Sequence, residues 1–382
     1  MDFNLDETQQ DLRKLAAEVL ARDGDPGERL WQAGLMSVCV PEEAGGAGLG
    51  PVELAVVLRE VGARAAAAGA LPVLVGTLAL ARHGTPEQRQ RLGSEEGGGA
   101  GLAVALHEPG RALADPPLTT ARRTADGWAL NGRKTSVPYP ALPLLVTADE
   151  GLFLVDRPPG DRPPVDRPLG DQSLGDQPSG ERSFGEQGTG GGGVGEVAGG
   201  AGVAGVAGVA VSSEYTSTGE PAATIVLDGA PGERVGGGEA VAGVRQLFMA
   251  AVAAQASGVL AGALQLTTAY IKERRQFGRA LAEFQAVTMQ IADVYIAGRA
   301  LDVAMWSAVW RLGEGLPAER DVALAAYHVS EAVKALYTCQ HLHGGLGLDV
   351  TYPLHRYFAQ ARHLSQLLGG ADAQLDLIGA LV

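Results

Sequence analysis

The sequence contains little cysteine and no excess of basic residues, and both shortages exclude classes of protein. Two cysteines in 382 residues, Cys39 and Cys339, are too few for a disulfide framework or a structural zinc site, and neither belongs to a C-x-x-C pair. We predict that both are buried core residues. Lys and Arg number 30 against 44 Asp and Glu, a net charge of −14, which disfavours a nucleic-acid partner because such a partner needs a basic face.

The sequence also lacks the segments that a membrane or an export pathway would need. We find no run of about 18 apolar residues free of charge, so no membrane span is predicted. The N-terminus, MDFNLDETQQDLRKL, is acidic and amphipathic and does not have the basic-then-apolar order of a secretion signal. We therefore expect a cytoplasmic protein with no membrane partner. Its 382 residues, 46% of them apolar, predict two or three domains with large cores.

Residues 1–98 have the pattern of an N-terminal helical domain. A turn is predicted at residues 41–46, and a new helix is predicted to begin at Pro51, since proline fits the first turn of a helix. Residues 52–71 predict one long Ala-rich helix.

Residues 99–235 predict a middle antiparallel β domain. Short apolar runs occur here, and Asp126-Gly127 and Asn131-Gly132 are typical of hairpin turns; the runs are residues 102–106, 128–130, 142–146 and 223–227. Residues 157–209 interrupt the domain with repeats of acidic residues, Pro and Gly that cannot form a packed core, so we predict a disordered insert there. Residues 200–205 match G-x-G-x-x-G, but they follow a glycine tract rather than a strand, so the match is compositional.

Residues 236–382 return to helical patterns and form the predicted C-terminal helical domain. Apolar residues three and four apart indicate one face of a long helix: Phe284, Val287, Ile291, Val294, Gly298, Leu301 and Met305. Helices, then strands, then helices predict an α+β multidomain fold. The absence of a β-α-β alternation argues against a doubly wound parallel sheet.

Two motifs in the C-terminal domain could bind a ligand. Arg274, Gln276 and Phe277 lie beside a glycine turn and precede Phe284-Gln285; Arg can hold phosphate oxygens in a bidentate fork, and Gln can bond a base or ribose edge. Residues 344–347, Gly-Gly-Leu-Gly, could let backbone N–H groups approach a phosphate. A solvated, capped helix end is the alternative for the first motif and an ordinary glycine C-cap for the second.

Four histidines near the C-terminus do not predict a metal site. His341 and His343 are two residues apart, and His355 and His363 follow, but their spacing offers no carboxylate or cysteine partner of a standard form. We therefore expect no bound metal.

Four motifs in order make the chain similar to the acyl-CoA dehydrogenases, a family of flavoproteins. They are P-E-E-A-G-G-A-G-L at 41–49, N-G-R-K at 131–134, R-R-Q-F-G with F-Q at 274–285, and H-L-H-G-G-L-G at 341–347. The resemblance implies an N-terminal helical domain, a middle β domain, a C-terminal four-helix bundle, and a tetramer that binds FAD between subunits. It also implies the residues that contact FAD: Arg274, Gln276, Phe277, Gln285, His341, Gly344 and Gly345.

The chain departs from that family where the reaction takes place. Family members desaturate an acyl-CoA thioester between carbons 2 and 3, using a glutamate base. Counting from His341 puts Leu368 at the position of that glutamate, and residues 245–248, the other family position, contain no acid. Two motifs that contact the flavin from the middle domain are also altered: Ser136-Val137-Pro138 replaces Trp-x-Thr, and His107-Glu108-Pro109 lacks the following Gly-Ser-Asp.

These departures favour a non-catalytic subunit that resembles those of actinobacterial α2β2 acyl-CoA dehydrogenases. Such a chain has no catalytic residue of its own and would supply FAD contacts to a catalytic partner chain. The resemblance implies an electron-transfer flavoprotein as acceptor and, by analogy, a steroid side-chain thioester as the acyl-CoA substrate. Two alternatives are a homotetramer with a relocated base, Glu108, Glu273 or Asp372, and a non-enzymatic scaffold.

Overall fold

The computed structural model describes residues 4–93, 101–125, 127–156 and 207–381. The predicted insert therefore lies outside the described residues, apart from its last three positions, and so does the glycine motif at 200–205. Those three positions are ordered: residues 207 and 208 form a turn, and Val209 begins a strand. The carbonyl of Gly208 accepts a hydrogen bond from the backbone N–H of Asp228 at 2.8 Å, which fixes the turn on the sheet.

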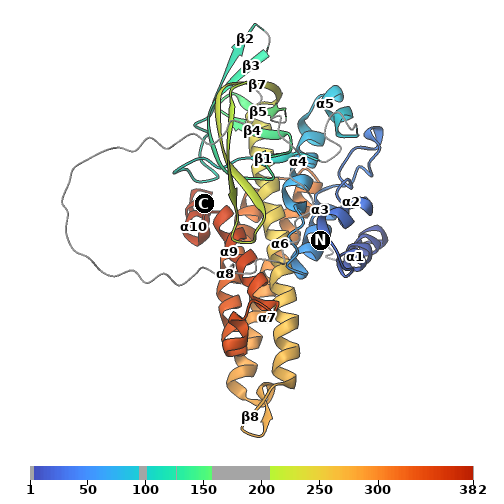
Figure 1. The fold of residues 1–382 in the computed structure, drawn as a ribbon, viewed down its shortest axis with the longest axis vertical. Coiled ribbons are helices and arrows are strands. Elements are labelled where there is room, and N and C mark those ends of the chain that lie inside the picture. The colour runs from blue at the N-terminus through green and yellow to red at the C-terminus, as the bar shows by residue number, and fades with distance from the viewer. Residues whose placement is uncertain (1–3, 94–100, 126, 157–206, 382) are drawn as a thin grey trace, which may run out of the picture.

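The N-terminal region consists of helices that pack beside a long central helix (Figure 1). Side chains cap several of these helices at their first turns: Asp6 accepts from the N–H of Gln9, and Thr85 accepts from the N–H of Gln88. The elements are α1 (Glu7–Leu20), α2 (Pro26–Gln32), η1 (Glu42–Ala44), α3 (Pro51–Ala63), α4 (Ala70–His83), α5 (Pro86–Gln90) and η2 (Arg91–Gly93).

The prediction of one helix over residues 52–71 was wrong, because the chain breaks between α3 and α4. Ala65 and Gly69 adopt φ values of 46° and 63°, which an α-helix cannot contain. At Gly69 a side chain has no room, since a Cβ would lie 2.7 Å from the ring of Tyr139. A tertiary contact with the β domain thus overrides the helix propensity of the alanines.

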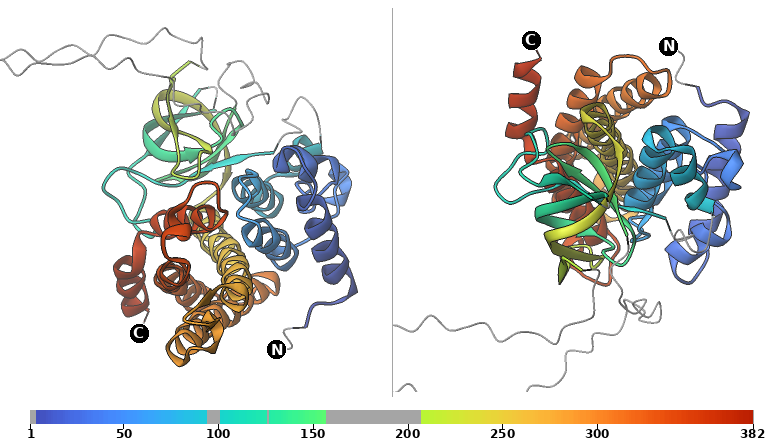
Figure 2. Two further views of the ribbon diagram at one scale, coloured as in Figure 1. Left: turned by 60° about the horizontal axis from the view of Figure 1, so that its bottom comes forward. Right: turned by 90° about the horizontal axis from the view of Figure 1, so that it is seen from above.

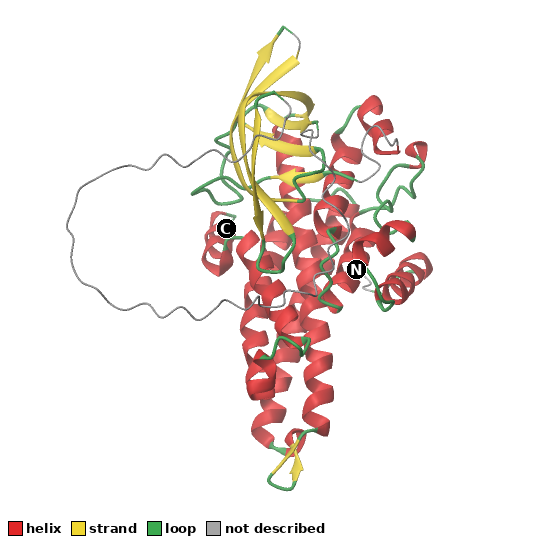
Figure 3. Cartoon of the chain, in the orientation of Figure 1, coloured by secondary structure: helices red, strands yellow, loops and turns green. Residues whose placement is uncertain are grey.

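The middle region is a sheet of seven strands (Figure 3), and its longest strand, β7 (Pro221–Gly236), lies at the centre. The strands are β1 (Ala103–Ala105), β2 (Thr120–Thr124), β3 (Gly127–Pro138), β4 (Leu144–Ala148), β5 (Gly151–Val155), β6 (Val209–Tyr215) and β7 (Pro221–Gly236). Their order is β1-β4-β5-β7-β3-β2, and β6 also pairs with β7. All pairs are antiparallel except β1 with β4, which is parallel, so the predicted antiparallel sheet is mixed at one edge.

The two predicted hairpin dipeptides have different outcomes. Gly127 begins β3, which pairs with β2 as an antiparallel hairpin, whereas residue 126 lies outside the described residues. Asn131-Gly132 does not form a turn: it lies inside β3 at a break in the register after Leu130. The side-chain oxygen of Asn131 instead accepts from the N–H of Gly229 at 2.8 Å, which holds a bulge rather than a hairpin.

The C-terminal region is a bundle of long helices that extends away from the sheet (Figures 1 and 3). Its elements are α6 (Gly238–Glu273), β8 (Arg275–Gln276), β9 (Arg279–Ala280), η3 (Leu281–Glu283), α7 (Gln285–Gly313), α8 (Glu319–His343), η4 (Gly344–Leu348), α9 (Leu354–Leu367) and α10 (Gly370–Ala380). The predicted apolar face of α7 is confirmed at Val294, Leu301 and Met305, which are fully buried. The α+β fold class is therefore confirmed.

Helix α6 is the central element, and it joins the bundle to both other regions (Figure 2). It is also the one helix of the described chain that is long and apolar enough to cross a membrane, contrary to the prediction from the sequence. In this fold 89% of its most apolar window is buried. The two cysteines are buried as predicted, with Cys39 1% and Cys339 0% exposed.

Glycines allow α6 to cross α3 at very short range. A Cβ on Gly62 would lie 2.0 Å from the carbonyl oxygen of Gln255, and one on Gly258 would lie 1.9 Å from the carbonyl oxygen of Arg59. Close to this crossing, Asp302 of α7 forms an ion pair with Arg59 at 3.3 Å and accepts a hydrogen bond from Ser257. The crossing therefore locks the N-terminal helices onto the bundle.

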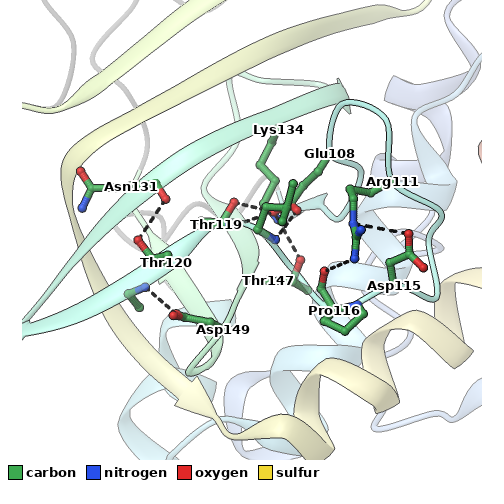
Figure 4. A network of polar contacts seen from close by, with 12 residues as sticks. Glu108, Arg111, Asp115, Pro116, Thr119, Thr120, Asn131, Lys134, Thr147 and Asp149 are labelled. Carbon is green, nitrogen blue, oxygen red and sulfur yellow. Dashed lines mark hydrogen bonds and ion pairs between the residues drawn. The ribbon is translucent and has the colours of Figure 1, made fainter.

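A buried ion pair holds the β domain together (Figure 4). Lys134 of β3 is 0% exposed, and its Nζ donates to Glu108 Oε1 at 2.7 Å and to Thr147 Oγ1 at 3.0 Å. Glu108 also accepts from the N–H and hydroxyl of Thr119 and from the N–H of Leu118. Burial raises the pKa of Glu108, but the hydrogen bonds and the charge of Lys134 outweigh it and lower that pKa to about 2.

We expect Lys134→Met to destabilise the protein by about 3–5 kcal/mol, because it leaves the carboxylate of Glu108 buried without its counter-charge. Urea unfolding followed by circular dichroism measures the loss. The matched control is Arg133→Met on the same strand, where the side chain is exposed; it should change stability by no more than about 0.5 kcal/mol. Equal losses in the two variants would contradict the assigned role of the pair.

Candidate functional site

The first predicted cofactor motif forms a hairpin at the end of the bundle farthest from the sheet (Figure 1). Strands β8 and β9 pair here, and the N–H of Leu281 donates to the carbonyl of Arg274 at 2.9 Å. The two central residues of the turn, Phe277 and Gly278, both have positive φ, 51° and 81°. This is the backbone pattern of a type I′ turn, which is strained for an aromatic residue.

The side chains of this hairpin face outward rather than into the chain's own core. Phe277 is 92% exposed, and its ring meets the edge of Phe284 at 6.4 Å between centroids. Arg274, Gln276 and Gln285 are exposed, and within the described residues none has a side-chain hydrogen bond or ion pair. A cation, two amides and an aromatic ring are thus displayed together, available to a group outside this chain.

The second predicted motif is a glycine turn that ends helix α8. Gly344 adopts φ 59° and ψ −138°, a conformation suited to glycine, and a Cβ on Gly344 or Gly345 would meet nothing within 4 Å. Both glycines and His341 are exposed. The turn therefore presents its backbone to open space, where a ligand could approach the peptide groups closely.

An aromatic stack fixes the glycine turn and brings it to the same end of the bundle as the hairpin. His343 is 3% exposed and stacks on Tyr270 with ring centroids 4.3 Å apart. Its Nδ1 lies 2.8 Å from the carbonyl of Cys339, which can only accept, so Nδ1 carries the proton and Nε2 accepts from the hydroxyl of Tyr352 at 3.1 Å. Burial lowers the pKa of His343, in keeping with a neutral ring.

Sequence reasoning did not identify Tyr270 and Tyr352 as supports of this turn. Tyr270 lies in the last turn of α6, four residues before Arg274, so it joins the glycine turn to the base of the hairpin. Its position four residues before Arg274, at the end of a predicted helical region, could have marked Tyr270 as a residue near the hairpin. Its stacking partner is far away in sequence, and no spacing rule would have paired the two residues.

Leu368, which the resemblance predicts to stand in place of the catalytic glutamate, is a buried residue. Leu368 follows the last residue of α9, is 1% exposed and belongs to the main hydrophobic core. At the other family position, Phe248 is also buried, and Arg245 donates hydrogen bonds to the carbonyl oxygens of Ala114 and Asp115. Neither position carries a group that could accept a proton from a substrate.

The three acids considered as relocated bases lie apart from one another. Glu108 is inside the β domain and already binds Lys134. Glu273 is exposed at the distal end of the bundle, and Asp372 is exposed in the first turn of α10. None of the three lines the cavity described next.

A cavity lies where the β domain meets the helices, and residues that the resemblance predicts to be altered family positions line it. They include His107 and Ser136, together with Leu367, the neighbour of the buried Leu368. The Nε2 of His107 lies 2.7 Å from the carbonyl of Leu367, which ties the loop after β1 to the end of α9. Ser136 adopts φ 52°, so the backbone here is strained as well as altered in sequence.

Tyr139 and Glu220 complete one wall of this cavity, and sequence reasoning overlooked both of them. The hydroxyl of Tyr139 donates to Glu220 Oε1 at 3.1 Å, and the hydroxyl of Thr218 donates to Glu220 Oε2 at 2.9 Å. Burial raises the pKa of Glu220, although these hydrogen bonds oppose the shift. Glu220 could not be recognised from the sequence because it follows the predicted insert and belongs to no motif.

Comparison with known proteins agrees with this arrangement of elements. Residues 6–104 match the family model of the acyl-CoA dehydrogenase N-terminal domain, and residues 248–382 match that of the C-terminal domain. The acyl-CoA dehydrogenase FadE28 of Mycobacterium tuberculosis is 35% identical over 384 residues, which cover 100% of this chain and 98% of that protein.

Two solved structures are similar over almost their whole length. A Tcur3481-Tcur3483 steroid ACAD is 34% identical with a TM-score of 0.80, covering 98% of this chain and 97% of that chain. A chain of the ChsE4-ChsE5 complex from Mycobacterium tuberculosis is 31% identical with a TM-score of 0.79, and the match covers 100% of this chain and 98% of that chain. The predicted cofactor, FAD, agrees with these relationships. The chain belongs to the acyl-CoA dehydrogenase family.

Proposed function

We propose that this chain is the non-catalytic subunit of a heteromeric acyl-CoA dehydrogenase and supplies part of the FAD site to a catalytic partner chain. The burial of Leu368 in the hydrophobic core carries the proposal. A base must reach the substrate in a dry site with a tuned pKa, and an aliphatic side chain has no proton-accepting atom. The similarity to a chain of the ChsE4-ChsE5 complex supports the heteromeric arrangement.

The outward direction of the hairpin supports a role across a subunit interface. Arg274 would hold a phosphate of FAD, Gln276 and Gln285 would bond polar edges, and Phe277 would pack against a ring. Gly344 and Gly345 leave room for close approach to the backbone. When bound, FAD accepts the hydride that leaves the acyl chain during desaturation.

The residues near the cavity support the other half of the proposal, that this chain does not hold a flavin of its own there. Ser136 and Pro138 stand where family members have an aromatic wall and a hydroxyl donor. The ring of His107 forms a hydrogen bond with the carbonyl of Leu367, so this side chain of the altered loop already has a partner within the chain.

The partner chain, an α2β2 assembly, the acyl group and the electron acceptor belong to the same proposal. The similarity to a steroid ACAD favours a steroid side-chain thioester of CoA as substrate. An electron-transfer flavoprotein is the acceptor that the family resemblance implies. The cytoplasm is the expected location. We also propose the domain limits 1–98, 99–235 and 236–382.

The native mass and flavin content of the chain test the proposal directly. We expect no bound FAD in the chain purified alone. We expect one FAD per heterodimer when it is co-expressed with a candidate chain that has glutamate at the base position. Native mass spectrometry and flavin absorbance give both numbers. One FAD per chain in a homotetramer would support the relocated base instead, and no FAD in either sample would support the scaffold.

Arg274→Ala should weaken FAD retention in the heteromeric complex by about 1.5–3 kcal/mol, since it removes a charge-assisted hydrogen bond. Flavin release during dilution, followed by fluorescence, measures the loss. Arg275→Ala is the matched control, because this arginine is the exposed neighbour in β8. If both variants release FAD equally, the effect is one of general charge, and the specific role of Arg274 is excluded.

Leu368→Glu should not give the lone chain dehydrogenase activity, because the middle-domain flavin contacts would still be absent. Reduction of added FAD or of a dye by an acyl-CoA panel measures the outcome. A folded Leu368→Glu protein that binds FAD and turns over substrate without a partner would overturn the proposal. Circular dichroism must accompany the assay, because a buried carboxylate also destabilises the core.

A further inference from the structure

The hairpin at the tip of the bundle keeps a turn conformation that its sequence does not favour. Phe277 has a φ of 51°, in the left-handed region, where a residue with a side chain is strained. Its side chain is 92% exposed, so burial in the core does not offset the strain. Strain of this kind persists only where surrounding contacts hold the residue, and for Phe277 these contacts come from the hairpin and the start of α7.

Phe284 is the fixed point of these contacts, because its backbone is anchored on both sides. Its N–H donates to the carbonyl of Leu281 at 3.1 Å, and its carbonyl accepts from the N–H of Thr288 at 3.0 Å in the first turn of α7. The hydroxyl of Thr288 donates to the same carbonyl at 3.2 Å. The ring of Phe284 therefore has a defined place, and the ring of Phe277 meets it edge to face with 6.4 Å between centroids.

Arg279 attaches the second strand of the hairpin to that ring. Its guanidinium carbon lies 4.1 Å from the centroid of the Phe284 ring, which is a cation–π contact. Arg279 also lies opposite Gln276 in the pairing of β8 with β9, so these two side chains are neighbours on one face of the hairpin. Within the described residues no side-chain hydrogen bond or ion pair competes for Arg279, so the ring is the contact that orients it.

We propose that Arg279 is a positioning residue: it holds the hairpin against the ring of Phe284, so that Gln276 and Phe277 are displayed to FAD in one fixed arrangement. The inference rests on the proposed function, because Gln276, Phe277 and Gln285 are FAD contacts only in that proposal. Gln276 faces Arg279 across the hairpin, and Gln285 directly follows Phe284. An arrangement that is fixed before FAD binds lowers the cost of ordering these side chains.

Fluorine NMR of the full-length lone chain tests the positioning without FAD. The chain has seven phenylalanines, and labelling with 4-fluorophenylalanine gives each a signal; Phe277→Leu identifies that of Phe277. In Arg279→Gln, which removes the cation, this signal should sharpen and move towards the shift of the free amino acid. Arg279→Lys keeps a cation and should retain the original signal. The matched control, Arg275→Gln, removes the same charge from an exposed residue that lies opposite Ala280, and it should leave the signal unchanged.

Flavin release from the heteromeric complex on dilution, followed by fluorescence, tests the connection with FAD. Arg279→Gln should weaken FAD retention about two- to fivefold, the factor that corresponds to the loss of an exposed cation–π contact. Arg279→Lys and Arg275→Gln should both retain FAD as the original complex does.

Five results would overturn the proposal. An unchanged Phe277 signal in Arg279→Gln, or the same change in Arg275→Gln, would mean that the cation–π contact does not hold the hairpin. A changed signal in Arg279→Lys would mean that the cation is not what matters. Unchanged FAD retention in Arg279→Gln would mean that the arrangement does not serve FAD, and a loss as large as that of Arg274→Ala would mean that Arg279 contacts FAD itself. FAD that is absent from the complex of the original chains would overturn the proposed function as well, whereas the fluorine results concern the positioning alone.

Discussion

The crossing of α3 over α6 is the contact on which the rest of the molecule depends. Two helices can approach with backbone against backbone only where side chains are absent, and Gly62 and Gly258 provide those places. Any larger residue at either position would push the helices apart. Because α6 also contacts the sheet, α4 and the other bundle helices, a shift at this crossing would move the cavity wall and the N-terminal helices together. Gln255 lies at this crossing and also lines the cavity, so the same constraint that assembles the domains positions part of the cavity wall.

The chain's two candidate sites differ in how far sequence could identify them. The hairpin and the glycine turn are contiguous motifs, so their residues could be named from the order of amino acids alone, and the fold brings them to one end of the bundle. The cavity is assembled from α3, α4, α6, α9 and the β domain. Residues such as Tyr139 and Glu220 come together only through tertiary contacts, and nothing in their local sequence marks them as neighbours.

The fold shows the same division between local and tertiary information. The apolar periodicity of α7 and the short apolar runs of the β domain follow from the local sequence, and both were predicted. The break between α3 and α4 could not be predicted, because it depends on the ring of Tyr139 lying against Gly69. Asn131-Gly132 resembles a hairpin turn by every local rule, but β7 pairs across it and converts it into a bulge. The parallel pairing of β1 with β4 likewise depends on a partner 41 residues away in sequence, Ala103 opposite Leu144.

The place of β7 in the sheet has a consequence for how the protein is synthesised. β7 pairs with β3, β5 and β6, so it supplies the central hydrogen bonds of the sheet, yet it is the last of the seven strands to leave the ribosome. Until residue 236 has emerged, β3 and β5 each lack the neighbour that lies between them, and their edges are open to other chains. Residues 156–208 lie between β5 and β6 in sequence and are therefore synthesised before β7. These residues delay the synthesis of β7, so they lengthen the interval during which a nascent chain carries unpaired strands.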